Sequence, residues 1–323
     1  MATPNLSELI TTTLRSRTGK LADNVTTNNA LLNRLKERGR VKPFSGGRTI
    51  VQELNYAENG TFMYYSGYET LNVSPSEVMS AAEFDIKQAA VAVSISGLEE
   101  LQNAGKEQVI DLLESRIENA EQTMHNNIYD GLYSDGTGSG GKQIGGLQLI
   151  VADAPTSGTV GGIDRATWSF WQNQVFDATG DGGAATTASN IQTYFNRMYA
   201  EVVRGQDRPD LILVDNVYWG FFMASLQNIQ RITNEKMGAL GFTSVKFMDA
   251  DVVLDGGNGG GCPASHAYFL NTKYIHYRPH AQRNMVPLSP DRYATNQDAH
   301  VKLIGWAGNM TASNCSLQGV LKE

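Results

Sequence analysis

SGLEELQNAGKEQVIDLLESRIENAEQTMHNNIYD, residues 96–130, predicts one long amphipathic helix around which the rest of the chain must be arranged. Ser96 and Glu99 have the spacing of a capping box. Apolar residues then recur at steps of three and four and form a single stripe. A continuous helix from Leu98 to Asp130 would span about 50 Å, at 1.5 Å per residue. The stripe consists of Leu113, Ile117, Ala120, Met124 and Ile128.

The segment before this helix predicts a β-hairpin. Apolar and polar residues alternate from Thr49 to Tyr56, and Asn59-Gly60 is typical of the tight turn that joins two strands. A return strand is expected from Thr61 to Tyr65. A further strand is expected over residues 84–95, where the apolar positions change parity. A β-bulge near residues 89–90 would explain that change.

Residues 49–86, called the ribbon below, have an unusual composition. They hold six acidic residues and no Lys or Arg, and five aromatic residues lie between positions 56 and 68. A two-stranded ribbon is marginal alone in water. We therefore expect a projection that lies on another molecule, and the alternative is a hairpin folded onto its own domain. The acidic residues are Glu53, Glu58, Glu69, Glu77, Glu83 and Asp85, and the aromatic residues are Tyr56, Phe62, Tyr64, Tyr65 and Tyr68.

The N-terminal segment has the opposite charge. Residues 1–48 carry a net charge of +6, whereas the remaining residues carry −13. Such an asymmetry indicates that the basic segment contacts something acidic, either nucleic acid or a neighbouring copy; the alternative is a solvated tail. A helix is expected from Asn24 to Arg38, ended by Gly39, and it must dock on something because its apolar stripe is short. That stripe is Ala30, Leu31, Leu32 and Leu35.

The second half of the chain mixes helices and strands without a strict β-α-β rhythm, which favours the α+β class. Helices are expected over residues 189–204 and 216–229. Strands are expected over residues 210–214, 248–254, 268–270, 274–277, 301–306 and 316–321.

No segment of the sequence has a convincing catalytic, cofactor or metal-binding motif, so the sequence does not predict an enzyme. Gly136 to Lys142 matches G-x-x-x-x-G-K, but a helix precedes it and Gln143 stands where a phosphate loop has Ser or Thr. Asp249 and Asp251 form an acidic pair with no third ligand, which favours a solvated strand face. His276 and His280 are four apart, but Pro279 argues for extended chain rather than a helical metal pair.

Compartment signals are equally sparse. The two cysteines, Cys262 and Cys315, form no motif, and are expected to be free thiols in a reducing cytoplasm. No stretch has the length of a membrane span or the apolar core of a signal peptide, so no contact with a membrane is expected.

The order of these features resembles the major capsid proteins of tailed bacteriophages, which have the Hong Kong ninety-seven fold. Three stretches carry the likeness: GGLQLIVADAPTSGTVGGIDRATWSFW from Gly145, PDLILVDNVYW from Pro209, and YFLNTKYIHYRPHAQRNMVPL from Tyr268. The resemblance implies an N-terminal arm (1–47) and an extended loop (48–86). It also implies a peripheral domain with the spine helix (87–145 and about 285–310) and a mixed axial domain (146–284 and about 311–323).

The resemblance also implies a function. The chain would be a structural subunit that assembles into pentamers and hexamers of an icosahedral head enclosing double-stranded DNA. It would be located in the virion, and in the host cytoplasm during assembly. A separate scaffold protein and a portal are expected partners, and a decoration protein is conceivable. Some members crosslink through a lysine in the extended loop, but this sequence has no lysine between Lys42 and Lys87.

Contacts between copies follow from the charges. In the family the extended loop of one subunit overlies its neighbour near that neighbour's arm. We expect acids of the ribbon to meet bases of the arm, while ribbon tyrosines supply most of the adhesion. The expected contact residues are Arg34, Lys36, Arg38, Arg40, Glu53, Tyr56, Glu58, Tyr64, Tyr65, Tyr68 and Glu83.

Two other functions remain open from the sequence. One is an encapsulin-type shell with the same fold, which encloses protein cargo. The other, from a different class, is a metal-dependent sugar-transferring enzyme that uses Asp249 and Asp251. The size of the purified protein separates them, because an enzyme would be a small oligomer and a shell would be of megadalton mass.

Overall fold

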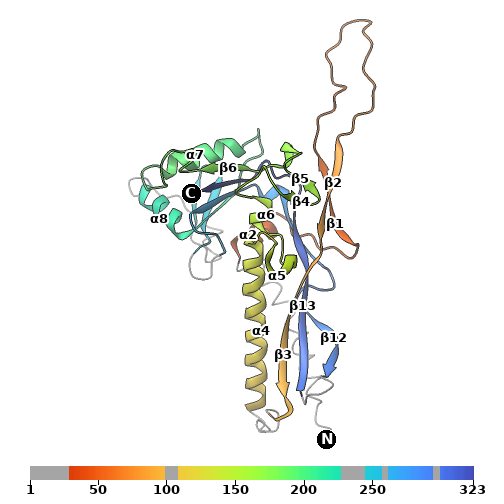
Figure 1. Cartoon of the computed structure of the whole chain (residues 1–323), viewed down its shortest axis with the longest axis vertical. Helices are drawn as coiled ribbons and strands as arrows, with labels where there is room; N and C mark the ends of the chain where they lie inside the picture. Colours follow the sequence, from red (N-terminus) through yellow and green to blue (C-terminus); the bar gives the residue numbers. More distant parts are fainter. Residues whose placement is uncertain (1–28, 99–107, 227–243, 257–260, 294–298) are drawn as a thin grey trace.

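A single helix, α4, Gln108–Tyr133, runs along the long axis of the molecule in the lower part of Figure 1. The computed structural model describes residues 29–98, 108–226, 244–256, 261–293 and 299–323. Residues 99–107 of the predicted helix, including Glu99, therefore lie outside the described residues, and the predicted cap residue Ser96 is the last residue of a strand. The predicted apolar stripe is confirmed from Ile117 onward, because its members face the core and are buried. These members are Ile117, Ala120, Met124 and Ile128.

A sheet of four strands lies beside α4 (Figure 1). Its central strand pairs along one edge with β3 and along the other edge first with β12 and then with β11. The bounds are β3 Lys87–Ser96, β11 Ile275–Pro279, β12 Val286–Tyr293 and the central β13 Ala299–Ala312.

The predicted β-bulge at residues 89–90 is wrong. The pairing of β3 with β13 is regular from Lys87↔Gly308 to Ser96↔Ala299. The apolar parity changes instead at Ile86, where the chain leaves one strand partner and begins pairing with β13. A break between two strands shifts the inward face just as an inserted residue does.

The ribbon consists of β1, Thr49–Asn55, and β2, Met79–Asp85, paired antiparallel from Thr49↔Asp85 to Asn55↔Met79. The predicted tight hairpin is therefore wrong, since residues 61–65 are not its return strand. Asn59 does begin a turn, in which the Phe62 N–H donates to the Asn59 carbonyl at 3.4 Å. The chain then continues through a long loop, residues 57–78. This loop projects from the top of the molecule in Figure 1, whereas the N-terminal end of α4 lies at the bottom.

The second half of the chain forms a six-stranded sheet in the order β6-β14-β10-β7-β9-β8, with both parallel and antiparallel pairs. This mixture confirms the α+β class. Helices α7, Ile191–Val202, and α8, Asn216–Ser225, cover one face. The strands are β6 Gln174–Asp177, β7 Leu211–Val214, β8 Ser244–Phe247, β9 Ala250–Leu254, β10 His266–Leu270 and β14 Gly319–Lys322.

Both faces of this sheet are covered, which explains why all four residues of β7 are buried. Leu211 and Leu213 face the core shared with α4, and Ile212 and Val214 face α7 and α8. The predicted strand over residues 248–254 begins two residues later than expected, at Ala250. Met248 has a positive φ of 52° and lies in the turn before β9.

The described part of the arm packs on its own chain. Helix α2, Ala30–Glu37, begins at Asn29, whose side chain accepts the Leu32 N–H, and ends before Gly39, whose φ is +65°. Its predicted stripe is confirmed and is buried against the sheets. The other short elements are α5 Gly138–Gly141, α6 Leu147–Ile150, β4 Thr159–Val160, β5 Ile163–Asp164, and the 3₁₀ turns Ser169–Trp171 and Thr272–Tyr274.

Candidate functional site

The base of the ribbon is fixed to the body of its own chain. Alternate residues of β1 and β2 face inward, as the pleat requires, and join the main core. Gly161, in the turn between β4 and β5, lies so close that an added Cβ would be 2.8 Å from the Ala82 Cβ. Its carbonyl also accepts the Glu83 N–H at 2.9 Å. The buried inward residues are Ile50, Leu54, Ala82 and Phe84.

Tyr56 belongs to this anchored base. Its ring stacks on Phe170 with centroids 5.4 Å apart and meets Trp168 edge-on at 6.1 Å. Such aromatic pairs contribute about 0.5–1.5 kcal/mol beyond the area they bury. Tyr56 was predicted to touch a neighbouring copy, but the structure places it in a contact within the chain. We therefore assign it to anchoring the ribbon.

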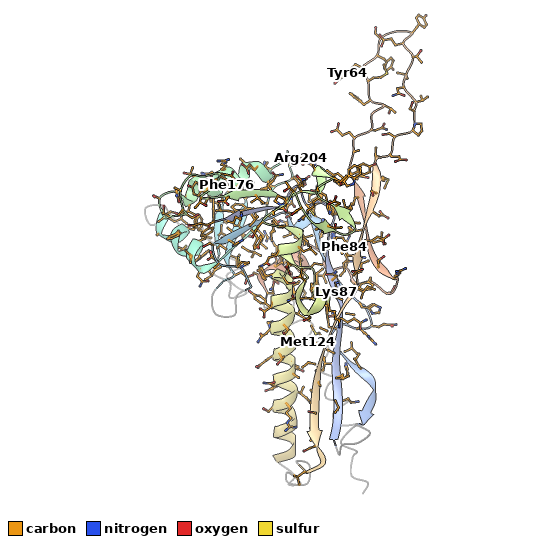
Figure 2. The ribbon with its side chains drawn as sticks, in the orientation of Figure 1. Tyr64, Phe84, Lys87, Met124, Phe176 and Arg204 are labelled. Carbon is orange, nitrogen blue, oxygen red and sulfur yellow. The ribbon has the colours of Figure 1, made fainter. Side chains whose placement is uncertain are left out.

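The ribbon loop, residues 57–78, differs from the anchored base because its large side chains are exposed to solvent. Phe62 is 75% exposed, Tyr64 90% and Tyr68 fully exposed, and Tyr65 is exposed as well. Figure 2 shows Tyr64 on the projecting loop, away from the body of the molecule. A contiguous exposed set of large apolar side chains marks an interaction site rather than an ordinary surface. Glu58 lies on the same loop and is also exposed.

Two more predicted acids lie on the outer face of the ribbon. Glu53 and Glu83 are exposed, and Val51, which lies directly opposite Glu83 and two residues before Glu53, is 50% exposed. Thr49 Oγ1 donates a long hydrogen bond of 3.4 Å to Glu83. The outer face is thus acidic with an apolar centre, and its carboxylates are open to a partner.

The predicted arm bases do not all remain available. Arg34 Nε lies 3.1 Å from Asp210 Oδ2, and Arg34 Nη2 lies 3.0 Å from Asp251 Oδ2. Arg34 is therefore engaged within its own chain. Arg38 also reaches Asp210, at 3.4 Å, but its side chain stays half-exposed, and Lys36 is exposed. The expected pairing of arm bases with ribbon acids between copies stays a prediction for Lys36, Arg38 and Arg40.

Asp249 and Asp251, which were considered as metal ligands, do not face each other. Asp251 is only 2% exposed and faces Arg34, whereas Asp249 lies in the turn before β9 and bonds to Arg208. The expected solvated strand face is therefore wrong for Asp251. No cluster of three or more metal-ligating side chains occurs within the described ranges. In the same ranges, no helix is long and apolar enough to cross a bilayer.

The other sequence motifs have structural explanations. His276 lies in β11 and His280 follows it in extended chain, as predicted, and the ring of His280 packs edge-on against Phe44. The stretch Gly136 to Lys142 contains only the short α5, where Ser139 has a positive φ of 55°. A phosphate loop needs a following helix of full length, which is not present there.

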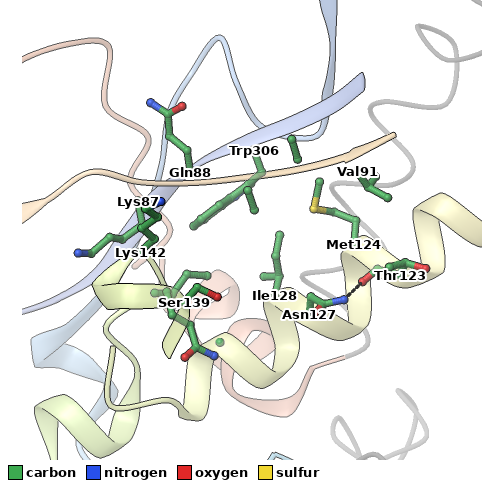
Figure 3. Close-up of a pocket in the computed structure, with 15 residues that line it drawn as sticks. Lys87, Gln88, Val91, Thr123, Met124, Asn127, Ile128, Ser139, Lys142 and Trp306 are labelled. Atoms are coloured by element: carbon green, nitrogen blue, oxygen red, sulfur yellow. Dashed lines mark hydrogen bonds between the residues drawn. The ribbon is translucent and has the colours of Figure 1, made fainter. Parts of the chain in front are cut away.

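A groove that the sequence did not reveal lies between α4, β3 and α5 (Figure 3). Its volume is about 460 Å³, and Met124, Ile128 and Trp306 form its apolar floor. Its charged lining residues, Lys87 and Lys142, are both basic. Lys87 Nζ donates to the Gly141 carbonyl at 2.7 Å, which holds α5 against β3. A groove with an apolar floor and a basic rim fits a segment that is both aromatic and acidic.

A second unpredicted feature joins α4 to the six-stranded sheet. Tyr129 and Tyr133, one turn apart on α4, both donate hydrogen bonds to the carboxylate of Asp255, just after β9. Burial raises the pKa of Asp255 to about 6. The sequence offered no signal for this contact, because its members are more than 120 residues apart.

Comparison with known proteins identifies the fold. No protein-family model and no curated protein matches the sequence. The capsid of cyanophage A-1(L) is similar with a TM-score of 0.65 and 16% identity, covering 88% of this chain and 90% of that chain. The capsid of a native GTA particle has a TM-score of 0.54 and 12% identity, covering 88% of each chain. The SrpI encapsulin of Synechococcus elongatus PCC 7942 has a TM-score of 0.51 and 9% identity, covering 91% and 88%.

These likenesses extend over most of each chain, so they concern the whole architecture rather than one motif. The chain has the fold of tailed-phage major capsid proteins, the Hong Kong ninety-seven fold. The fold predicted from the resemblance is thereby confirmed, and the same fold is shared with an encapsulin.

Proposed function

We propose that this chain is the structural subunit of an icosahedral phage head, assembling into pentamers and hexamers that enclose double-stranded DNA. The observation that carries the proposal is the ribbon loop. It holds three tyrosines and a phenylalanine that are exposed by 64% or more, on a chain whose fold is that of shell proteins. Exposing such large apolar side chains to water is unfavourable in free energy. A second copy that covered them would remove this cost.

The groove between α4 and β3 is the surface on a neighbouring copy that best fits the ribbon loop. The loop, residues 57–78, carries Glu58, Glu69 and Glu77 and no base. The groove has Lys87 and Lys142 on its lining and no acid. A stable contact needs roughly 1,000 Å² of buried surface, so the ribbon's outer face would have to contribute as well.

Negative-stain microscopy and size-exclusion chromatography of the purified chain test the proposal. We expect closed shells or capsomers of megadalton mass. A protein that stays a monomer or a small oligomer over a wide range of salt and protein concentration would contradict the shell function. Treating the particles with nuclease and then extracting them shows whether they hold DNA.

The likeness to an encapsulin supports a second candidate, a shell around protein cargo. Shells purified from their native source would separate the two, because a phage head contains DNA and an encapsulin contains one enriched protein. A metal-dependent sugar-transferring enzyme has no such support, since Asp249 and Asp251 do not face a common point. That the chain is not an enzyme remains an expectation.

The remaining partners belong to the same proposal. A separate scaffold protein and a portal would act during assembly in the host cytoplasm, and a decoration protein could bind the finished virion. They are expected only because the capsid fold implies them. Co-expression with neighbouring genes, followed by microscopy, would test each one.

A further inference from the structure

The arm and β11 together form a strip of cations on one side of the chain. Residues 40–44 run parallel to β11, with bridges Val41↔Tyr277 and Phe44↔His280. The Tyr277 N–H donates to the Arg40 carbonyl, and the Lys42 N–H donates to the Tyr277 carbonyl. Side chains alternate along such pairs. Tyr277 packs on Trp306, so its neighbours along the strip face the other way.

The side chains on that other face are Arg40, Lys42, His276 and Arg278, and their charges are close enough to act on one another. Burial, and then the positive charges of Lys42, Arg40 and Arg278, lower the pKa of His276 to about 4. The histidine is therefore neutral near pH 7. Arg40, Lys42 and Arg278 are the three cations of this face, and each of them acts on His276.

These three cations are not used inside the chain. None of Arg40, Lys42 and Arg278 forms a salt bridge with any residue that the structure describes. The Nε atoms of both arginines are buried and have no hydrogen-bond partner there. The Lys42 side chain is exposed, and Arg40 and Arg278 are only partly buried, so an anion outside the chain can approach the charged ends of all three.

The nearby carboxylates are already engaged. Arg40 also lines a cavity of about 400 Å³ between the arm and the six-stranded sheet. The three acids of that cavity bind other cations: Asp207 binds Lys273, Asp210 binds Arg34, and Asp249 binds Arg208. The strip therefore keeps its excess positive charge although the body of the chain is acidic.

We propose that Arg40, Lys42 and Arg278 form a phosphate-binding strip that contacts the backbone of double-stranded DNA. The identity of this polyanion rests on the proposed function, a shell that encloses DNA. Three cations without an ion-pair partner in the described chain give one copy weak, sequence-independent binding to DNA. Because a shell repeats the strip in many copies, the total binding of DNA by the shell is strong. The competing partner, the acidic ribbon of a neighbouring copy, is separated from DNA by the test below.

The test measures binding of the full-length, unassembled chain to a fluorescent 30-base-pair DNA duplex by anisotropy, from 50 to 200 mM salt. One variant combines Arg40→Gln, Lys42→Gln and Arg278→Gln. The matched control, with the same change of charge, combines Arg197→Gln, Arg204→Gln and Lys246→Gln at exposed positions. Circular dichroism and thermal unfolding verify that each variant is folded. Lys42→Gln alone, at an exposed position, serves if the triple variant is not folded.

We expect the strip variant to weaken DNA binding at 50 mM salt by about tenfold or more and to lower the salt slope by about 2–3. The single Lys42→Gln variant should lower the slope by about 1, and the control should leave binding unchanged. Equal losses in the strip variant and the control would overturn the proposal, since general charge would then explain them. So would unchanged DNA binding by the strip variant.

A second measurement separates the strip from contacts between copies. The strip variant should still form shells, and a synthetic peptide of residues 56–79 should not displace DNA from the wild-type chain. Displacement by that peptide, or loss of shells with normal DNA binding, would assign the strip to the ribbon and overturn the proposal. If the wild-type chain bound DNA through the strip but never formed shells, the shell function would fail while the phosphate site stood.

Discussion

Arg34 fastens the arm to the six-stranded sheet by bonding to two carboxylates at once. Asp210 precedes β7 and Asp251 lies on the adjacent β9, so one guanidinium holds the arm to both strands. Asp210 also accepts the N–H and the hydroxyl of Thr272. The group is largely buried, and in such a group the loss of one charge leaves the others poorly solvated. Arg34 therefore holds the arm on its own chain, and its predicted contact with a neighbouring copy stays a prediction.

Replacing this cation should destabilise the chain strongly. We expect Arg34→Met to lower the free energy of unfolding by about 3–5 kcal/mol, because the buried Asp251 carboxylate loses the cation that it contacts. Urea unfolding followed by circular dichroism measures the change. Arg208→Gln removes an exposed bond to Asp249 and should cost about 0–1 kcal/mol. Similar losses in the two variants would show that the Arg34 contact is not a buried one.

Asp255 should make stability depend on pH. Its pKa is raised to about 6 in the folded chain, so folding favours the protonated form. The stabilisation from that proton is complete below about pH 4 and is lost as the pH rises through 6. We expect the stability of the wild type relative to Asp255→Asn to fall by about 3 kcal/mol between pH 4 and pH 7.5.

Asp164→Asn is the control for this pH dependence. Hydrogen bonds from Thr167 and then Ala166 lower the pKa of Asp164, so this group stays ionised over the whole range. The stability difference between the wild type and that variant should therefore be flat from about pH 5 to pH 7.5, where Asp164 is ionised in the folded and the unfolded chain alike. A flat difference for Asp255→Asn as well would mean that the tyrosines of α4 stabilise the carboxylate rather than the acid.

At the scale of elements, hydrophobic periodicity predicted what local sequence controls. The stripe of α4, the helix at residues 191–202 and the strand at 211–214 were all confirmed. The ribbon shows where local information ends. Its second strand, MSAAEFD, has a weak apolar pattern, and it pairs with β1 across a loop of more than twenty residues. Asn59-Gly60 had the local signature of a tight turn, but inward packing of Ala82 and Phe84 selected the distant partner instead.

The predicted contact residues likewise include some that local sequence placed correctly and some that it could not. The composition of the ribbon predicted exposed tyrosines, and Tyr64, Tyr65 and Tyr68 are exposed. It could not predict that Tyr56 packs on Phe170, because that partner is more than one hundred positions away. Arg34 likewise meets Asp210 across 176 residues. Charge and aromatic content therefore indicate what a segment carries, and only the fold shows which of its groups are already used.

The ribbon loop should be dispensable for folding and necessary for assembly. We expect the triple variant Tyr64→Ser, Tyr65→Ser, Tyr68→Ser to change the free energy of unfolding of the unassembled chain by less than about 0.5 kcal/mol, since these rings are exposed. Shell yield in negative-stain images should fall sharply. Tyr56→Ser is the matched control, because it should destabilise the chain itself by about 1–2 kcal/mol. Normal shells from the triple variant would remove the ribbon loop from the interface.

The whole molecule has a basic arm and an acidic ribbon, and neither segment neutralises itself. Residues 1–48 carry +6 and residues 49–86 carry −6, so copies that place one segment against the other gain complementary charge. Among the arm bases predicted for this role, Lys36 and Arg38 are exposed, whereas Arg34 is largely buried against its own chain. Each exposed pair contributes only about 0–1 kcal/mol. Repeated around every capsomer, such pairs would select the register of neighbouring copies more than the strength of their contact.

Charge reversal tests this pairing. We expect Lys36→Glu with Arg38→Glu to reduce the yield of closed empty shells, because like charges would face each other in every contact. Adding Glu53→Lys and Glu58→Lys on the ribbon should restore part of that yield, since the attraction returns with its sign exchanged. Arg204→Glu with Lys246→Glu is the control for net charge and should assemble normally. Normal empty shells from the arm variant, in low and high salt, would show that the ribbon acids have another partner.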